Sequence, residues 1–380
     1  MQAGEPGRPG GGRRVLLGCY GVPGRGGAST VAYRLHAALL AAGVDAHYLT
    51  IVDTEDPAYY RYVLGERYGN PEGLPNVETR VLAGRLHGPH PELGRAIEAA
   101  APDVLVAMGT LSATLLKRAS PRRPLVLLTT GCQQLKERIA RGVVRDFLEE
   151  RARLARRRSR LPVYPVQEQE AVELSDLVVT HAEAIRLLYG AFFPWLEGKL
   201  WPEVISFAEW IFEDAAPYTH LARPFEERDI DVLFIASYWT RPEKNYPLAC
   251  RIAAGLRGAR VHVVGDVERR CPGAVHHGFV ADRRELFALL GRAKAVVCPS
   301  AFDAAPGILF EASALGCNVV ASPNCGNARL CHAELLAPRG DLAGFLRATR
   351  AALTRRYADH ADAFRGSAPT QRLIELVQVV

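Results

Sequence analysis

The sequence predicts an α/β protein with two doubly wound domains. Short apolar, strand-like runs alternate with helix-like segments over most of the 380 residues. Such runs are typical of buried parallel strands, because helices cover both faces of a parallel sheet. The alternation restarts after Ser206–Asp229, a segment rich in proline, acids and aromatic residues. Since a chain of this length is also too long for one ordinary core, we expect two domains.

The first run of elements begins with an apolar strand at Val15–Leu17 and a helix at Ser29–Ala42. Further strand-like runs follow it along the chain: Ala46–Thr50, Asp103–Met108, Leu125–Thr129 and Leu177–Thr180. We therefore assign residues 15–208 to a first domain. Residues 1–14 are rich in Gly, Pro and Arg and lack the apolar region of a secretory signal, so we expect a disordered tail there.

The second run of elements occupies residues 229–364, after a linker at 209–228. Its expected strands and helices alternate as in the first: Asp231–Ala236, Tyr246–Leu256, Arg260–Gly265, Ala274–Val280, Arg283–Leu290, Ala295–Cys298, Ile308–Leu315 and Asn318–Ala321. Two such arrays in series indicate two doubly wound domains. A last helical stretch at about 365–380 comes too late in the chain to belong simply to the second array.

The composition favours a cytoplasmic globular protein with an anionic ligand. The net charge is +6, which suits a nucleotide diphosphate without requiring one. No apolar run reaches the roughly 18–20 residues that span a bilayer. The eight cysteines form no CxxC pair, so we expect free buried thiols. The spacing of Cys325, Cys331 and His332 does not suit the usual zinc ligand pairs, and we expect no metal site.

Basic residues concentrate at Arg151–Arg160, where six of ten residues are arginine. A solvated helix face is the simpler interpretation. A peripheral membrane contact, or contact with another polyanionic surface, is the alternative. No recognised nucleic-acid-binding module accompanies this segment, so we expect no nucleic-acid partner.

A glycine-rich loop runs from Gly18 to Ser29, between the first strand and the first helix. Glycines such as Gly26 and Gly27 let backbone amides approach a phosphate, and the helix N-terminus adds a favourable field. The loop spells neither the GxGxxG fingerprint nor the Walker pattern. A tight strand-to-helix turn without a ligand is therefore the alternative interpretation.

A second loop, Ala236–Asn245, follows the first strand of the second array and carries Arg241 and Lys244. Doubly wound sheets bind ligands at the carboxyl ends of their strands. Arginine can fork two phosphate oxygens and lysine supplies a point charge, so both are candidates to face a diphosphate. The alternative is an exposed charged loop.

A third segment, Pro299–Ser322, carries Asp303 before a helix and Glu311 about one turn inside it. Pro306 suits the first helical turn. The amides of Gly307 and Ile308 would then form an anion site, while the two carboxylates accept hydrogen bonds from sugar or ribose hydroxyls. The alternative is an acid that complements the helix dipole, together with a solvent-facing Glu311.

These three segments, in this order, resemble the family-4 retaining glycosyltransferases of the GT-B fold. The resemblance is carried by Gly26-Gly27-Ala28, by Arg241-Pro-Glu-Lys244, and by two acids separated by seven residues after Pro299-Ser300. The stretch Val275–Val280 looks like the family's Gly-Phe-Val loop beside the donor base and includes Phe279. The resemblance implies two Rossmann-like domains that face each other across a cleft.

The resemblance also implies a reaction. A sugar would move from a UDP- or GDP-sugar to a hydroxyl of a secondary metabolite or glycan, with retention of configuration and without a metal or a tightly bound cofactor. Glu311 would hold the ribose hydroxyls and Asp303 the transferred sugar. Arg241 and Lys244, with the Gly26-Gly27 amides, would offset the charge on the departing diphosphate.

The first domain would shape the acceptor pocket through residues that follow its strands. The candidates are Tyr20, His181 and two short stretches, Met108–Thr110 and Thr130–Gln134. Within these stretches we single out Thr110 and Thr130. The terminal helix would cross back to this domain.

The sequence departs from the family in four places. Many relatives have a glutamate where Asp303 stands. Trp239 stands where relatives usually have an arginine, Ala304-Ala305-Pro306 replaces Gly-Phe-Gly, and Thr130-Gly131-Cys132 lacks a histidine that relatives often have. Two alternatives therefore stay open: a sugar-nucleotide epimerase of the same architecture, or a catalytically silent scaffold that binds a nucleotide sugar.

Overall fold

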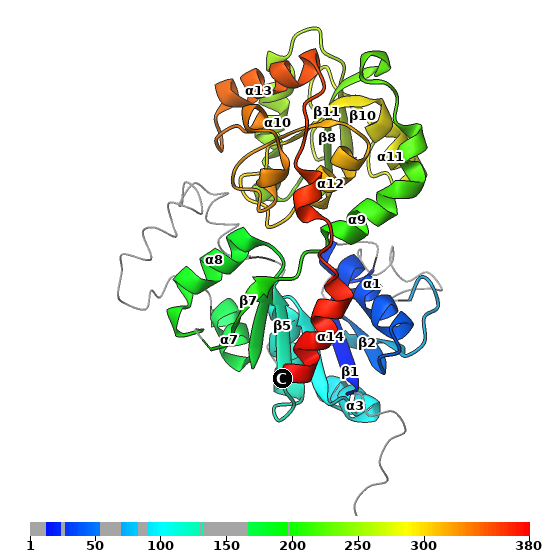
Figure 1. Cartoon of the computed structure of the whole chain (residues 1–380), viewed down its shortest axis with the longest axis vertical. Helices are drawn as coiled ribbons and strands as arrows, with labels where there is room; N and C mark the ends of the chain where they lie inside the picture. The colour runs from blue at the N-terminus through cyan, green and yellow to red at the C-terminus, as the bar shows by residue number, and fades with distance from the viewer. Residues whose placement is uncertain are drawn as a thin grey trace, which may run out of the picture.

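Two parallel β-sheets form the framework of the chain, and Figure 1 shows them one above the other with helices around each. The computed structural model describes residues 13–23, 27–53, 70–82, 90–129, 131, 166–196 and 198–380. The first sheet has seven strands and the second has five. The predicted fold class, with two Rossmann-like units, is confirmed.

The first sheet has the order β3-β2-β1-β4-β5-β6-β7. Its strands are β1 (Val15–Tyr20), β2 (Ala46–Asp53), β3 (Val77–Leu82), β4 (Val104–Met108), β5 (Leu125–Thr129), β6 (Leu177–Thr180) and β7 (Leu200–Val204). The central strands are largely apolar, and every residue of β4 and β5 is buried. The strand order reverses between β1 and β4, which is where doubly wound sheets open a crevice for a ligand.

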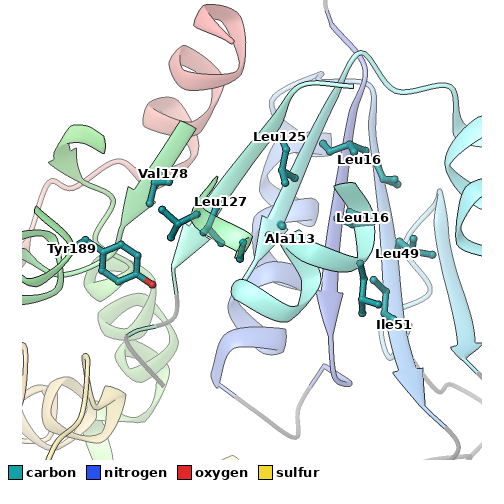
Figure 2. Close-up of a cluster of buried hydrophobic side chains, with 14 of the residues drawn as sticks. Leu16, Leu49, Ile51, Ala113, Leu116, Leu125, Leu127, Val178 and Tyr189 are labelled. Carbon is teal, nitrogen blue, oxygen red and sulfur yellow. The ribbon is translucent and has the colours of Figure 1, made fainter. Parts of the chain in front are cut away.

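Helices cover both faces of this sheet. The elements are α1 (Gly27–Ala41), α3 (Pro91–Ala100), α4 (Thr110–Ala119), α7 (Val166–Leu174), α8 (Glu183–Phe192), the short η1 (Pro194–Leu196) and, from the end of the chain, α14 (Pro369–Val379). Successive side chains of a strand point to opposite faces. Leu16 of β1 therefore packs with α4 in the cluster of Figure 2, whereas Leu17 packs with α1 and α14 on the other face.

The second sheet has the order β10-β9-β8-β11-β12. Its strands are β8 (Ile230–Tyr238), β9 (Val261–Asp266), β10 (Val275–His276), β11 (Ala293–Cys298) and β12 (Asn318–Ala321). Its helices are α10 (Tyr246–Gly255), α11 (Arg283–Arg292), α12 (Gly307–Ala314) and α13 (Leu342–Thr354), with short turns η4 (Pro242–Lys244), η5 (Ala328–Leu330), η6 (Ala333–Leu335) and η7 (Ala361–Phe364). The expected strand Ala274–Val280 is too long: β10 ends at His276, and Gly278 adopts a positive φ of 68°, outside the extended region of regular strands.

The segment expected as a linker, 209–228, is helical. It forms α9 (Ala208–Ala215), η2 (Ala216–Leu221) and η3 (Phe225–Glu227). Arg34 of α1 donates to the Trp210 carbonyl at 2.7 Å, while Phe212 of α9 packs edge-on against Phe310 of α12. The segment is thus packed against elements of both sheets.

Two other sequence expectations concern segments that are wholly or largely undescribed. Residues 1–12 of the expected tail and Arg151–Arg160 lie outside the described residues. Arg14, the last residue of that tail, is fixed: its amide donates to Asp103 at 2.7 Å and its guanidinium donates to Asp45 at 2.6 Å. Among the helices that the structure describes, none is long and apolar enough to cross a membrane.

Figure 1 shows the red α14 running beside the blue α1, so the end of the chain completes one face of the first sheet. Leu376 of α14 is 0% exposed in that cluster.

We expect Leu376→Ala to destabilise the first domain by about 2–5 kcal/mol, because it leaves a cavity in the core. The matched control is Val379→Ala on the same helix, where the side chain is 69% exposed and the expected change is below about 0.5 kcal/mol. Urea unfolding followed by circular dichroism measures both, and equal effects would contradict this packing.

Candidate active site

The loops that follow the strands of the second sheet carry most of the predicted site residues. Lys244 follows β8, Phe279 follows β10, Asp303 follows β11, and Glu311 lies on α12 after it. Because the strands are parallel, their carboxyl ends share one edge of the sheet. The fold therefore brings to one edge residues that are far apart in the sequence.

Lys244 and Asp303 form an ion pair at this edge. The Lys244 ammonium donates to Asp303 at 2.5 Å, and the two side chains are 20% and 14% exposed. Burial disfavours the charged lysine, but the Asp303 carboxylate outweighs it, and the pKa of Lys244 lies above its ordinary value. Lys244 is therefore a fixed positive charge at neutral pH.

Arg241 takes a different partner from Lys244. Its guanidinium donates from Nε to Glu243 at 2.8 Å, and a second N–H contacts the same carboxylate oxygen. The Glu243 side chain is only 7% exposed, whereas that of Arg241 is 45% exposed. Arg241 thus lies at the solvent side of the loop, held by a buried acid.

Trp239 is a core residue. Its indole N–H donates to the Val264 carbonyl at 2.9 Å and fastens the end of β8 to β9. Gly265 lies directly beneath, since a Cβ there would come within 3.2 Å of the indole nitrogen. The position that relatives fill with an arginine therefore has a structural role in this chain.

Helix α12 begins at Gly307, one residue before the predicted start, and Pro306 is its N-cap. Gly307 and Ile308 supply the first two amides of the helix, which have no acceptor within the helix itself. Among the described residues, no side chain forms a capping hydrogen bond at this end of α12. These amides and the helix dipole favour an anion at this position.

Glu311 lies one turn inside α12, and its side chain is 16% exposed. The alternative interpretation of a solvent-facing Glu311 is therefore wrong. Arg283, at the start of α11, approaches its carboxylate at 3.5 Å and stacks over the Phe287 ring at 5.1 Å. Burial raises the pKa of Glu311; Arg283 opposes this rise, and Asp214 of α9 adds to it.

The loop with Phe279 lies against the end of β9. The Gly278 carbonyl accepts from the Gly265 amide at 2.7 Å, and α11 begins four residues after Phe279 with Asp282 as its N-cap. Phe279 and Arg283 therefore leave the same short connection between β10 and α11.

The first sheet contributes a second group of predicted residues at the carboxyl ends of its strands. Tyr20 ends β1, and its amide donates to the Ser112 hydroxyl oxygen at 2.9 Å. Thr110 begins α4 after β4, and His181 follows β6 with its Nδ1 2.6 Å from the Thr129 carbonyl. Gly27 is the first residue of α1 and is exposed. Gly26 and Thr130 lie outside the described residues.

Sequence reasoning missed several residues of this edge. Arg283 and Glu243 hold predicted residues through ion pairs, and the buried Asn324 donates to the Ala301 carbonyl at 2.9 Å. Glu243 lies between Arg241 and Lys244 in the sequence, so an ion pair with one of them could have been predicted. No pattern in the sequence links Asn324 to Ala301, since that bond depends on how two loops fold together.

Comparison with known proteins agrees with this geometry. Residues 229–355 match the family model described as "Glycosyl transferases group 1". A search of curated proteins finds no match. This match covers the second sheet and its helices, and together with the arrangement of the two sheets it confirms the predicted resemblance to the group 1 (family-4) glycosyltransferases of the GT-B fold.

Solved structures with this fold include enzymes of different activity. Sucrose-phosphate synthase from Thermosynechococcus elongatus is 17% identical with a TM-score of 0.59, over 96% of this chain and 99% of that one. Anabaena HepE in complex with UDP-glucose is 16% identical with a TM-score of 0.56, over 96% and 100%. UDP-GlcNAc 2-epimerase from Methanocaldococcus jannaschii is 12% identical with a TM-score of 0.54, over 97% and 100%. At these identities the similarity establishes the fold alone.

The contact between Arg283 and Glu311 predicts a specific pKa change. Arg283→Gln removes the cation nearest to Glu311, so the pKa of Glu311 should rise further above its ordinary value. Carbon-detected NMR of δ-carbon-labelled glutamate measures this, with Glu311→Gln to assign the signal. Arg284→Gln, at the next and exposed position of α11, is the control and should leave the titration unchanged. An unshifted Glu311 in Arg283→Gln would contradict the contact.

Proposed function

We propose that the protein transfers a sugar from a UDP- or GDP-sugar to a hydroxyl of a secondary metabolite or glycan, with retention of anomeric configuration. The observation that carries the proposal is the joint position of Lys244, Asp303 and the α12 N-terminus at one sheet edge, with Glu311 one turn along the helix. This edge offers a positive charge, carboxylates that can accept hydrogen bonds from hydroxyl groups, and backbone amides at a helix N-terminus. A nucleotide diphosphate sugar needs all three.

The diphosphate would lie against the Lys244 ammonium and the amides of Gly307 and Ile308. These groups are positioned before the reaction, so they stabilise charge as it develops on the departing phosphate oxygen. Arg241 would contribute a second, more exposed cation through the guanidinium face that Glu243 leaves open. The Gly26-Gly27 turn of the first domain would approach the same phosphates.

The nucleoside would be held by Glu311 and by the Phe279 loop. An ionised carboxylate accepts hydrogen bonds from both ribose hydroxyls, and Arg283 favours that ionised form. Phe279 lies in the connection between β10 and α11 and would border the base. Asp303 would accept hydrogen bonds from hydroxyls of the transferred sugar while it holds Lys244 in place.

In the proposed reaction, the bond between the anomeric carbon and the phosphate oxygen breaks as the acceptor oxygen bonds to that carbon. The attack comes from the face that the diphosphate leaves, which retains the configuration. The proton of the acceptor hydroxyl passes to the departing phosphate oxygen. The acceptor would lie at the edge of the first sheet, near Tyr20, Thr110 and His181.

The epimerase remains a second candidate because a UDP-GlcNAc 2-epimerase shares this fold. The silent scaffold is the third. A thermal-shift screen against UDP-, GDP-, ADP- and dTDP-sugars identifies the donor, because a ligand of the folded state raises its apparent stability. Proton NMR of the turnover mixture then separates the candidates: an axial or equatorial glycoside product, an epimerised nucleotide sugar, or an unchanged donor.

We expect Lys244→Ala and Glu311→Ala each to lower donor affinity or turnover at least about tenfold, a loss of roughly 1.4 kcal/mol in binding or barrier. The matched control is Lys294→Ala. Lys294 is also 20% exposed and also pairs with an acid, Asp231, but at the opposite end of the sheet. Kinetics like those of the wild type in both variants, with the sugar nucleotide found in the screen, would contradict the donor site.

A further inference from the structure

The loop that carries Asp303 is buried in the other domain. Ala301, Phe302 and Ala304 follow β11 of the second sheet, yet they belong to the hydrophobic cluster of the first domain, together with Ala182 and Ile185. Phe302 is 1% exposed. Tyr189 of α8 belongs to the same cluster, and Figure 2 shows it on the side of the view where the orange-tan ribbon of the second domain appears.

A second loop makes the same contact. A Cβ placed on Gly326 would come 3.4 Å from the Ala182 Cβ and 1.8 Å from the Ala304 carbonyl oxygen. The loop after β12 therefore lies between the Asp303 loop and the residue that precedes α8. Only a glycine fits there, because a Cβ would collide with the Ala304 carbonyl oxygen of the neighbouring loop.

Hydrogen bonds join these loops into one unit. The Asp303 amide donates to the Asn324 carbonyl at 3.2 Å, and the Gly326 amide donates to the Asp303 carbonyl at 2.8 Å. The Asn324 side chain, 3% exposed, donates to the Ala301 carbonyl at 2.9 Å. We call residues 301–304 and 324–326 the docked loops. A displacement of Phe302 would move Asp303, because the backbone of Asp303 is bonded on both sides.

The surface that receives the docked loops is continuous with the proposed acceptor edge. Ala182 directly follows His181, and His181 contacts the end of β5 through Thr129. The first domain thus holds the proposed sugar contact and the proposed acceptor site through the same short stretch of chain.

We propose that Phe302 is a positioning residue: its burial in the first domain sets Asp303, and through it Lys244, relative to the acceptor edge. This inference rests on the proposed function. Phe302 does not touch the nucleotide in this arrangement, since Glu311 and the α12 amides hold that part of the donor. Its loss should therefore affect the chemical step more than donor binding.

The test is Phe302→Leu, which keeps an apolar side chain but removes the ring. We expect kcat to fall at least about tenfold, because misplacement by about 1 Å is enough for such losses, while the Kd of the donor changes less than about twofold. The donor is whichever of UDP-glucose, UDP-galactose, GDP-mannose, ADP-glucose and dTDP-glucose the wild type turns over fastest, with transfer to water as the assay. Calorimetry gives Kd.

The matched control is Phe345→Leu. Phe345 is also a fully buried phenylalanine, but its cluster contains residues of the second domain only. We expect a similar fall in melting temperature for both variants and a fall in kcat for Phe302→Leu alone. A merely structural role of Phe302 predicts instead that both variants lose kcat to the same degree.

A variant in the first domain provides the independent check. Ala182→Leu places a larger side chain against Gly326 and should displace the docked loops without changing any residue of the second domain. We expect the same signature of lowered kcat with unchanged donor Kd. Unchanged kcat in both Phe302→Leu and Ala182→Leu overturns this inference and leaves the proposed function standing. A wild type that neither binds nor turns over any of the nucleotide sugars overturns both.

Discussion

Parallel pairing of the strands is the constraint on which the rest of this structure depends. A parallel sheet needs a crossover between strands, and each crossover begins at the same edge. Lys244, Asp303 and the α12 amides meet for that reason, although Lys244 and Asp303 are 59 residues apart. The apolar character of the strands, with helices on both faces, maintains the pairing. The parallel pairing of the strands therefore determines both the fold and the position of the site.

Charge at this edge is arranged in pairs. Lys244 is held by Asp303, Arg241 by Glu243, and Glu311 by Arg283. Each pair reduces the cost of burying a charged group, because an unpaired charge in a poorly hydrated site is strongly disfavoured. Each also fixes a side chain before a ligand arrives. In the third pair, burial and Asp214 raise the pKa of Glu311 and so act against its ionisation, whereas Arg283 favours the ionised form.

The structure explains two positions at which this chain departs from the family pattern. Trp239 replaces a cation with a buried hydrogen bond between β8 and β9, so charge in that loop comes from Lys244 and Arg241. Ala304, in the position of a family glycine, is buried in the docked loops. The alanine-rich loop thus packs against the first domain, and the contact extends from the core to the carboxylate that follows Phe302.

The sequence by itself determined the fold class, the two strand–helix arrays and the choice of Lys244, Asp303 and Glu311 as candidates. Alternating apolar runs and fixed spacing after a strand are local properties. Only the tertiary structure decided that Arg241 turns to Glu243, that Arg283 reaches Glu311, and that Phe302 lies in the other domain. Those contacts join loops on different strands, and their partners are selected by packing, which no local pattern encodes.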